Sequence, residues 1–452
     1  MRRPCSVASV QWPVVLALAA CVSAFAANDT VLIRNADVYP VSGAEMKGVS
    51  ILIQDGKIAD MGAKLVAPKG IKIVEAKGLR VYPGMIDSGT ELGLSEIGSE
   101  RVTNDANEIG EFMPQLKALI AVNADSANFG VVRVNGITSA ITYPAQGGRG
   151  GGGRGGAAAA QYIAGEAALI HVAGWNWEEM EIKGSAAMQL NFPLIAGRGG
   201  RGGGDEGEAP AAARGPATFT EAKRQYDQQI QKINDFFDAA RQYQKERSSN
   251  VVGFKKDLKM EAMMPVLEGK EPVAISASRE RSIHDAILFA EKQHIKVVIL
   301  QPRELAKTAA ELKSHNIPVI LGRTEALSEN EDDPYDQEMT LPSVAYKAGL
   351  KFAFGTFNNE FGRNLPYNAA RAVAFGLPYE EALKAITINA AEIWGVADQM
   401  GSIDKGKWAD LMLTDGDPME LSTQVKGVYI KGKEIELTNH QIELYRRYLA
   451  RP

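Results

Sequence analysis

The middle of the chain alternates short apolar runs with amphipathic segments, and this alternation restricts the fold more than any other feature. The run "PVAISA" at 272–277 precedes the helical pattern "RSIHDAILFAEKQH" at 281–294. The run "IKVVIL" at 295–300 likewise precedes "PRELAKTAAELKSH" at 302–315, and "KFAFG" precedes a third helical pattern. Apolar strands followed by amphipathic helices are typical of a parallel sheet with helices outside it.

A (β/α)8 TIM-like barrel is the simplest closed fold for such a repeat, and the chain has the roughly 250 residues or more that this fold requires. An open doubly wound sheet is the alternative that periodicity alone leaves open. No glycine-rich dinucleotide fingerprint opens a helix after the first strand, which removes the usual reason to prefer the open sheet. We therefore predict an α/β protein with its barrel at 83–397.

Short alternating strands stand at both ends of the chain. They occur in "VSILIQDGKIADMG" at 49–62 and return in "VKGVYIKGKEIEL" at 425–437. Alternation of apolar and polar residues broken by glycine predicts small antiparallel strands. We expect a discontinuous β-sandwich domain at 27–82 and 398–440, followed by a C-terminal tail at 441–452.

The first residues resemble an export signal. Arg2 and Arg3 precede the apolar run "WPVVLALAACVSAFA", which ends in a small-x-small triplet at Ala26. The run is shorter than the roughly 20 residues needed to cross a bilayer, which disfavours a membrane-spanning helix. We predict a signal peptide at 1–26 and an exported, periplasmic protein. The residues before Cys21 also resemble a lipobox, so a lipoprotein anchored through Cys21 is the alternative, and a membrane association is expected only then.

Composition excludes some partners. Charged residues make up 23% of the chain with both signs mixed, and the formal net charge is -5. No basic patch suggests nucleic acid. Both cysteines, Cys5 and Cys21, lie in the leader, so the mature chain is expected to have no disulfide.

Two glycine-arginine tracts interrupt the barrel pattern, near 147–156 and 197–216, and are expected to be mobile loops. Beyond the second tract, Thr218 and Glu221 have capping-box spacing, and apolar residues follow every three or four positions. This pattern predicts a long amphipathic helix. Its apolar stripe packs on the barrel in one interpretation and contacts another subunit in the other.

Four stretches carry a resemblance to a known family: "VYPGMIDSGTELGL", "GITSAITYP", "KFAFGT" and "ALKAITINAAEIWGVADQMGSIDKGKWADLMLTDGDP". On these the chain resembles the amidohydrolase superfamily, near the imidazolonepropionase-like branch. The resemblance implies a barrel hydrolase of cyclic amides, dipeptides or related C–N bonds. It also implies one or two divalent metals, typically zinc, at the carboxyl ends of the strands.

The metal-ligand positions of that family are altered in this chain. The two positions of the His-x-His motif hold Gly89 and Glu91, and a later histidine position holds Ser276. The aspartate position after the last strand holds Phe357, and Gln301 stands at the end of "IKVVIL". The lysine or glutamate of a middle strand could not be aligned. We therefore predict no metal cofactor.

The five histidines do not supply a replacement site by their pattern. His294 and His315 stand just before strands, which places them at the lower face of a barrel, and His284 lies on an outer helix. His440 lies beyond the β domain. His171, in "ALIHVAGW", could end a strand near the mouth of the barrel, the end at which the carboxyl ends of the parallel strands lie. One histidine in an apolar run is, however, more often a hydrogen-bonded core residue.

The sequence favours a noncatalytic protein that binds a small molecule or a homologous active amidohydrolase subunit, as a homo- or hetero-oligomer. The alternative is a hydrolase with a metal-free or rebuilt site. Five residues near the mouth are the candidates for acid, base or oxyanion groups there: Glu91, Arg279, Arg323, Asn358 and Glu360. A structural envelope protein anchored through Cys21 is the third possibility.

Overall fold

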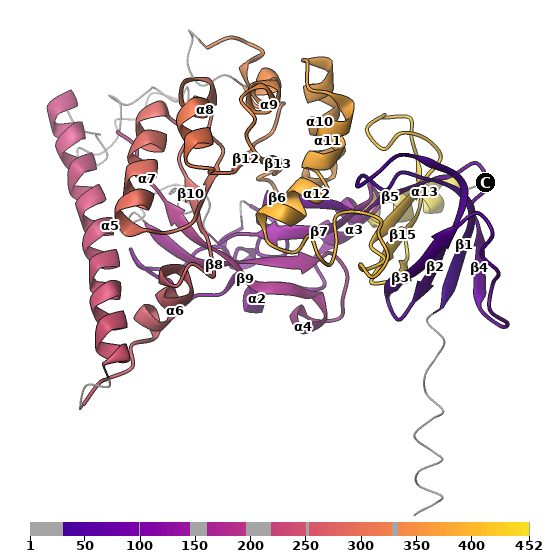
Figure 1. Cartoon of the computed structure of the whole chain (residues 1–452), viewed down its shortest axis with the longest axis horizontal. Coiled ribbons are helices and arrows are strands. Elements are labelled where there is room, and N and C mark those ends of the chain that lie inside the picture. The colour runs from indigo at the N-terminus through magenta and orange to yellow at the C-terminus, as the bar shows by residue number, and fades with distance from the viewer. Residues whose placement is uncertain are drawn as a thin grey trace, which may run out of the picture.

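The computed structural model describes residues 30–98, 100–144, 161–195, 218–249, 253–327 and 333–451. Its strands form two sheets, and Figure 1 shows a strand-rich β module beside a larger body that carries most of the helices. The predicted signal peptide, both cysteines and the two glycine-arginine tracts fall outside the described residues. Among the described residues, no helix is both long and apolar enough to span a membrane.

The β module contains strands from both ends of the chain. Its hydrogen-bonded order is β16-β15-β14-β5-β1-β2-β3, with β4 also paired to β1. The two chain ends meet where β5 pairs antiparallel with β14, with Tyr82 opposite Met412. The bounds are β1 Val31–Val38, β2 Met46–Gln54, β3 Lys57–Gly62, β4 Lys72–Glu75, β5 Arg80–Pro83, β14 Leu411–Thr414, β15 Val425–Ile430 and β16 Lys433–Ile435. The predicted discontinuous β domain is confirmed, with its strands joined in one sheet.

The second sheet is the predicted barrel, which is confirmed. Its order is β13-β12-β11-β10-β9-β8-β7-β6, and its two outer strands lie next to each other. There the backbone N–H of Phe357, just after β13, donates to the carbonyl of Gly89 in β6 at 2.7 Å. The bounds are β6 Met85–Thr90, β7 Ile137–Thr142, β8 Ile163–His171, β9 Glu181–Asn191, β10 Val273–Ser276, β11 Val297–Leu300, β12 Val319–Leu321 and β13 Phe352–Phe354.

One barrel strand differs from the parallel arrangement expected of a (β/α)8 barrel. Strand β8 pairs antiparallel with both β7 and β9, whereas the other neighbouring pairs are parallel. All nine residues of β8 are buried. A strand buried on both faces has the same apolar pattern in either direction, so the sequence did not reveal its reversal.

Helices cover the outside of the barrel strands (Figure 1). The bounds are η1 Arg101–Thr103, α2 Ala118–Ala121, α3 Ala127–Arg133, α4 Trp177–Met180, α5 Phe219–Ser248, α6 Leu258–Leu267, α7 Glu280–Gln293, α8 Leu305–Ser314, α9 Gln337–Lys347, η3 Gly362–Asn364, α10 Leu365–Ala374, α11 Tyr379–Ala385, α12 Ile388–Ile393 and α13 His440–Leu449. The capping box predicted for the long helix α5 is present, with Thr218 and Glu221 bonded reciprocally. Its buried stripe includes Tyr226, Ile233 and Phe237, while Phe219 is exposed.

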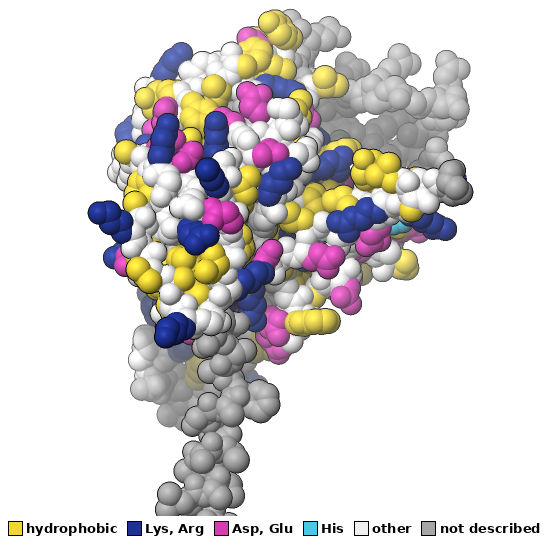
Figure 2. All heavy atoms as spheres, turned by 90° about the vertical axis from the view of Figure 1, so that its right-hand side faces the viewer, with side chains coloured by type: hydrophobic (Ala, Val, Ile, Leu, Met, Phe, Trp, Pro, Cys, Tyr) yellow, Lys and Arg dark blue, Asp and Glu magenta, His cyan; other side chains and the backbone are white. Residues whose placement is uncertain are grey.

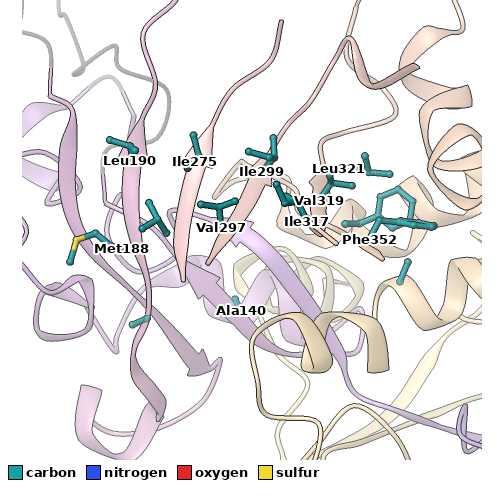
Figure 3. Close-up of a cluster of buried hydrophobic side chains, with 14 of the residues drawn as sticks. Ala140, Met188, Leu190, Ile275, Val297, Ile299, Ile317, Val319, Leu321 and Phe352 are labelled. Atoms are coloured by element: carbon teal, nitrogen blue, oxygen red, sulfur yellow. The ribbon is translucent and has the colours of Figure 1, made fainter. Parts of the chain in front are cut away.

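Side chains of the parallel strands alternate between two buried clusters. Ile275, Ile299 and Leu321 belong to the cluster between the strands and the outer helices, which Figure 3 shows. Their neighbours Ala274 and Val298 belong to a second cluster inside the barrel. The alternation follows from the two-residue period of a strand, and it makes the barrel a filled core. It also directs the last inward residue of each strand toward the mouth.

Candidate functional site

The carboxyl ends of the barrel strands hold the positions that the resemblance assigned to metal ligands. Gly89 lies near the end of β6, and Glu91 follows this strand directly. Ser276 ends β10, Gln301 follows β11, and Phe357 comes shortly after β13. Because these strands are parallel, the five residues stand at one rim of the barrel.

The ring of Phe357 occupies the space into which a side chain at residue 89 would extend. A β-carbon built on Gly89 would lie 2.6 Å from Cε1 and 2.7 Å from Cζ of this ring. A β-carbon on Gly355 would lie 2.8 Å from its Cε2 atom. All three separations are shorter than real side-chain contacts, so both glycines are needed for the ring to lie here. Phe357 adopts a left-handed φ of 46°, which is unusual for an aromatic residue.

The buried carboxylate of Asp87 accepts hydrogen bonds from residues of both strand ends beside the ring. Asp87 is 3% exposed, and its Oδ1 accepts the backbone N–H groups of Gly89 at 3.1 Å and Thr356 at 2.9 Å. The hydroxyl of Thr356 donates to Oδ2 at 2.5 Å. Burial raises the pKa of Asp87 to about 7, although these hydrogen bonds oppose the shift. Asp87 thus connects the two strand ends between which the ring lies.

On the neighbouring strands β9 and β10, amide and hydroxyl side chains form a short hydrogen-bonded chain at the same rim. The side-chain amide of Gln189, on β9, donates to Ser276 Oγ at 2.9 Å and to Asn191 Oδ1 at 3.0 Å. Asn191 in turn donates to the carbonyl of Gln161 at 3.0 Å. Sequence reasoning missed Gln189, because only the pairing of β9 with β10 shows which residues lie beside Ser276.

This set of residues does not fit a metal centre. Zinc in proteins takes three or four imidazole, thiolate or carboxylate ligands. Among the family's ligand positions that could be aligned, Glu91 is the one that carries such a group. Within the described part of the chain, no cluster of three His, Cys, Asp or Glu side chains has the arrangement of a metal site. No catalytic step is therefore assigned to a metal here.

The five candidates for a rebuilt site have different surroundings. Arg279 is the N-cap residue of α7, and Asn358 accepts the backbone N–H of Phe361 at 2.7 Å. Glu360 is exposed, and its carbonyl accepts from Arg363 at 3.1 Å. Glu91 is partly buried beside β6. Of the five, Arg323 is the one found in the wall of the pocket described next, among the residues that the structure describes.

A pocket of about 240 Å³ opens at the mouth beside the ring. We call it the mouth pocket; its polar and aromatic lining consists of Gln301, Arg303, Arg323, Glu338 and Phe357. Arg303 Nε lies 3.5 Å from Glu338 Oε1, and both side chains are mostly buried. Among its described lining residues, two guanidinium groups face one carboxylate. Sequence reasoning did not single out Arg303, which lies in a loop two residues after Gln301.

His171 is a core residue and is not at the mouth. The expectation that it could end a strand near the mouth is wrong, because β8 runs in the opposite direction and places His171 beside Ser139 at the start of β7. His171 is fully buried, and its Nε2 lies 3.1 Å from Asp410 Oδ2. Asp410 also accepts the backbone N–H of Lys431 at 2.7 Å. The pair joins the barrel to the β module.

The other histidines lie where the sequence placed them. His294 and His315 precede β11 and β12 at the lower face, and His315 Nε2 lies 2.7 Å from Glu291. His284, on the outer helix α7, lies 2.8 Å from Glu311. His440 begins α13 beyond the β module. None of the four lines the mouth pocket.

Comparison with known proteins gives one consistent family. The sequence model of the Amidohydrolase family matches residues 276–435. The chain is 24% identical over 442 residues to the amidohydrolase tasK of Hapsidospora irregularis, covering 89% of this chain and 42% of that protein. It is 30% identical over 158 residues to an imidazolonepropionase of Mesorhizobium japonicum, covering 33% of this chain and 36% of that protein. The matches thus span less than half the length of either relative.

The fold comparison covers nearly the whole chain. An amidohydrolase structure from Thermotoga maritima superposes with a TM-score of 0.75 and 26% identity, covering 90% of this chain and 99% of that one. A prolidase complexed with N-methylphosphonate-L-proline superposes with a TM-score of 0.52 and 15% identity, which shows the shared fold alone. Together with the barrel and its β module, these matches show that the chain belongs to the amidohydrolase superfamily.

Proposed function

We propose that this protein is a noncatalytic member of its superfamily that binds a small carboxylate-bearing molecule in the mouth pocket. The observation that carries the proposal is the position of the Phe357 ring against Gly89. Metal-dependent hydrolysis needs a metal-bound water between ligands from several strands. Here the last strand contributes an aromatic ring in place of a carboxylate, and the first strand contributes a glycine that leaves room for this ring.

The mouth pocket supports binding of an anion. Arg303 and Arg323 carry two positive charges, and Glu338 carries one negative charge that lies beside Arg303. A guanidinium group recognises a carboxylate through paired N–H donors, which gives both charge and geometry. Gln301 adds an amide, and Phe357 adds an apolar wall. The small volume of the pocket favours a compact ligand.

Binding can be tested with a panel of short dicarboxylates and N-acetyl amino acids by isothermal titration calorimetry. We expect at least one of these to bind, and Arg323→Met to weaken its binding about tenfold, the effect of losing about 1.4 kcal/mol. Arg224→Met, on the exposed face of α5, is the matched control and should leave binding unchanged. Equal binding to the Arg323 and Arg224 variants would contradict the mouth pocket as the site.

Catalysis is tested separately with the same N-acetyl amino acids and with dipeptides, in the presence of zinc. The proposal predicts no release of free amine above the buffer rate. Turnover that is lost in Glu91→Gln would instead favour the alternative of a rebuilt hydrolytic site.

Export and assembly are further parts of the proposal. We propose that the mature chain begins after Ala26 in the periplasm, or at a lipidated Cys21, as the leader pattern predicts. Mass spectrometry of the mature N-terminus distinguishes the two.

Figure 2 shows basic and acidic side chains interspersed on the face that carries the β module. This mixed surface supports a small-molecule or protein partner over nucleic acid, and co-purification with a homologous amidohydrolase would identify the partner as a catalytic subunit.

A further inference from the structure

A second and larger pocket lies at the opposite end of the barrel. Its volume is about 540 Å³, and its wall includes the residues that immediately precede three parallel strands: Pro272 before β10, Lys296 before β11 and Pro318 before β12. It is therefore at the lower face, across the filled barrel interior from the mouth. We call it the lower pocket. Its volume falls in the range of small-molecule sites, about 300 to 1,000 Å³.

One side of the lower pocket is apolar. Besides the two prolines, Ile287 of α7, Ile295 and Trp394 form part of its wall. Trp394 is 1% exposed, packs in the cluster inside the barrel, and contacts the ring of Tyr143 edge-on with centroids 6.1 Å apart. Trp394 therefore supports the pocket from behind, and the partly exposed side chains of Pro272, Ile295 and Pro318 supply the apolar surface that an aromatic ligand could contact.

The rim of the lower pocket is cationic. Its ionisable side chains are Lys183, Lys270, Lys296, His294, His315 and Glu291. Glu291, the carboxylate of this set, lies 2.7 Å from His315, and Lys270 lies 2.6 Å from Glu268 outside the set. The lining thus holds three lysines against one carboxylate, and one of these lysines, Lys270, has Glu268 beside it.

Lys183 is the cation that most needs a counter-ion. It is half-buried, its ammonium donates to the carbonyl of Trp394 at 3.1 Å, and burial lowers its pKa. The nearby carboxyl of Glu271 is 2% exposed and has no hydrogen-bond partner among the described residues. Burial, and after it the charge of Glu166, raises the pKa of Glu271 to about 8. Among the described residues, no carboxylate lies within salt-bridge distance of the Lys183 ammonium, whose printed hydrogen bond is to the carbonyl of Trp394. A partly dehydrated ammonium gains from an anion that replaces its lost water.

We infer that the lower pocket is a second binding site, for an organic anion with an aromatic body, whose carboxylate pairs with Lys183 and whose ring packs on the apolar wall. The inference does not rest on the proposed function of the mouth pocket. It assigns the lower face, usually a stabilising part of a barrel, a ligand of its own.

The probe is 2-naphthoate, and the matched neutral ligand is 2-naphthalenemethanol, which keeps the ring but lacks the charge. Isothermal titration calorimetry on the full chain should show 2-naphthoate binding at least about tenfold tighter than the alcohol, a ratio that corresponds to about 1.4 kcal/mol. In Lys183→Met this preference should vanish, because Met keeps much of the side-chain length without the ammonium. Lys77→Met, on an exposed turn of the β module, should behave like the parent protein.

Two further variants keep the test decisive. If Lys183→Met does not fold, as judged by circular dichroism, Lys296→Met on the exposed rim should still weaken 2-naphthoate binding by several-fold. The inference is wrong if 2-naphthoate does not bind saturably, or if neither lysine variant alters its binding. It is also wrong if Arg323→Met, rather than a lysine variant, abolishes the binding, since the anion would then lie in the mouth pocket.

Discussion

The ring of Phe357 occupies the space that a side chain at Gly89 would need, because two ring carbons lie 2.6 and 2.7 Å from the position of a β-carbon at residue 89. Gly89 does not have a positive φ, so its backbone does not itself require glycine. The requirement is steric and comes from the ring. The two positions, which the resemblance assigns to metal ligands, are therefore sterically coupled in this chain.

Gly89→Ala should therefore destabilise the parent protein by about 1 to 3 kcal/mol, the usual cost of overpacking a core. In a Phe357→Ala background the same substitution should cost much less, because the ring is gone. Urea unfolding of the parent, both single variants and the double variant measures the coupling. Additive effects would mean that the two residues do not compete for the same space.

Asp87 should make stability depend on pH. Its pKa of about 7 in the folded protein lies above the value near 4 of an unfolded aspartate, so the folded state holds the proton more tightly. The stabilisation that protonated Asp87 gives the folded state is complete below about pH 4. It decreases as the pH rises toward about 7 and does not change further above that pH. Asp87→Asn should remove this slope between pH 5 and 7. Urea midpoints measured across that range test it, and parallel slopes for parent and variant would contradict the assignment.

The pair formed by His171 and Asp410 should stabilise the junction between barrel and β module. His171→Leu removes the ring nitrogen that lies 3.1 Å from the buried carboxylate of Asp410, and a buried polar group that loses its partner typically costs about 1 to 3 kcal/mol. Asp410→Asn retains an oxygen for the N–H of Lys431 and should cost less. Thermal unfolding ranks the two variants. A smaller loss for His171→Leu than for Asp410→Asn would argue against this role.

Sequence patterns predicted the fold well where one pattern has one structural solution. The buried runs of β10 and β11, the capping box at Thr218 and the strands at both chain ends were all read from local periodicity. The reversed direction of β8 was not predictable, because a strand buried on both faces carries no signal of direction. Only the pairing of distant segments determines it.

The sequence predicted which residues stand at the rim of the barrel, but it did not predict which of their side chains are in contact. The altered ligand positions followed from aligned motifs, but the contact of Phe357 with Gly89 depends on the left-handed φ of Phe357, which its sequence neighbours do not specify. The placement of Gln189 beside Ser276 depends on strand register. Sequence gives the identities of the mouth residues, and the tertiary structure decides which of them touch.

Restoring the ligands should restore metal affinity if the barrel still directs these positions to one point. The variant carrying Gly89→His, Glu91→His, Ser276→His and Phe357→Asp is expected to bind zinc, as measured by calorimetry on folded protein. The matched variant that keeps Phe357 should not, because an imidazole at residue 89 would collide with the ring. Hydrolysis need not return, since groups that orient imidazoles are part of a working site. A folded fourfold variant with no zinc affinity would show that the positions do not converge.

The most direct test of the noncatalytic assignment is the zinc content of the parent protein. The protein is equilibrated with excess zinc, dialysed and measured by inductively coupled plasma mass spectrometry, alongside Glu91→Gln. Parent and variant are expected to retain the same low amount, because the described rim residues lack a set of ligands and the ring of Phe357 fills the space between its strands. Retention of about one zinc per chain in the parent, the stoichiometry of a single bound ion, and its loss in Glu91→Gln would show that the protein has a metal site.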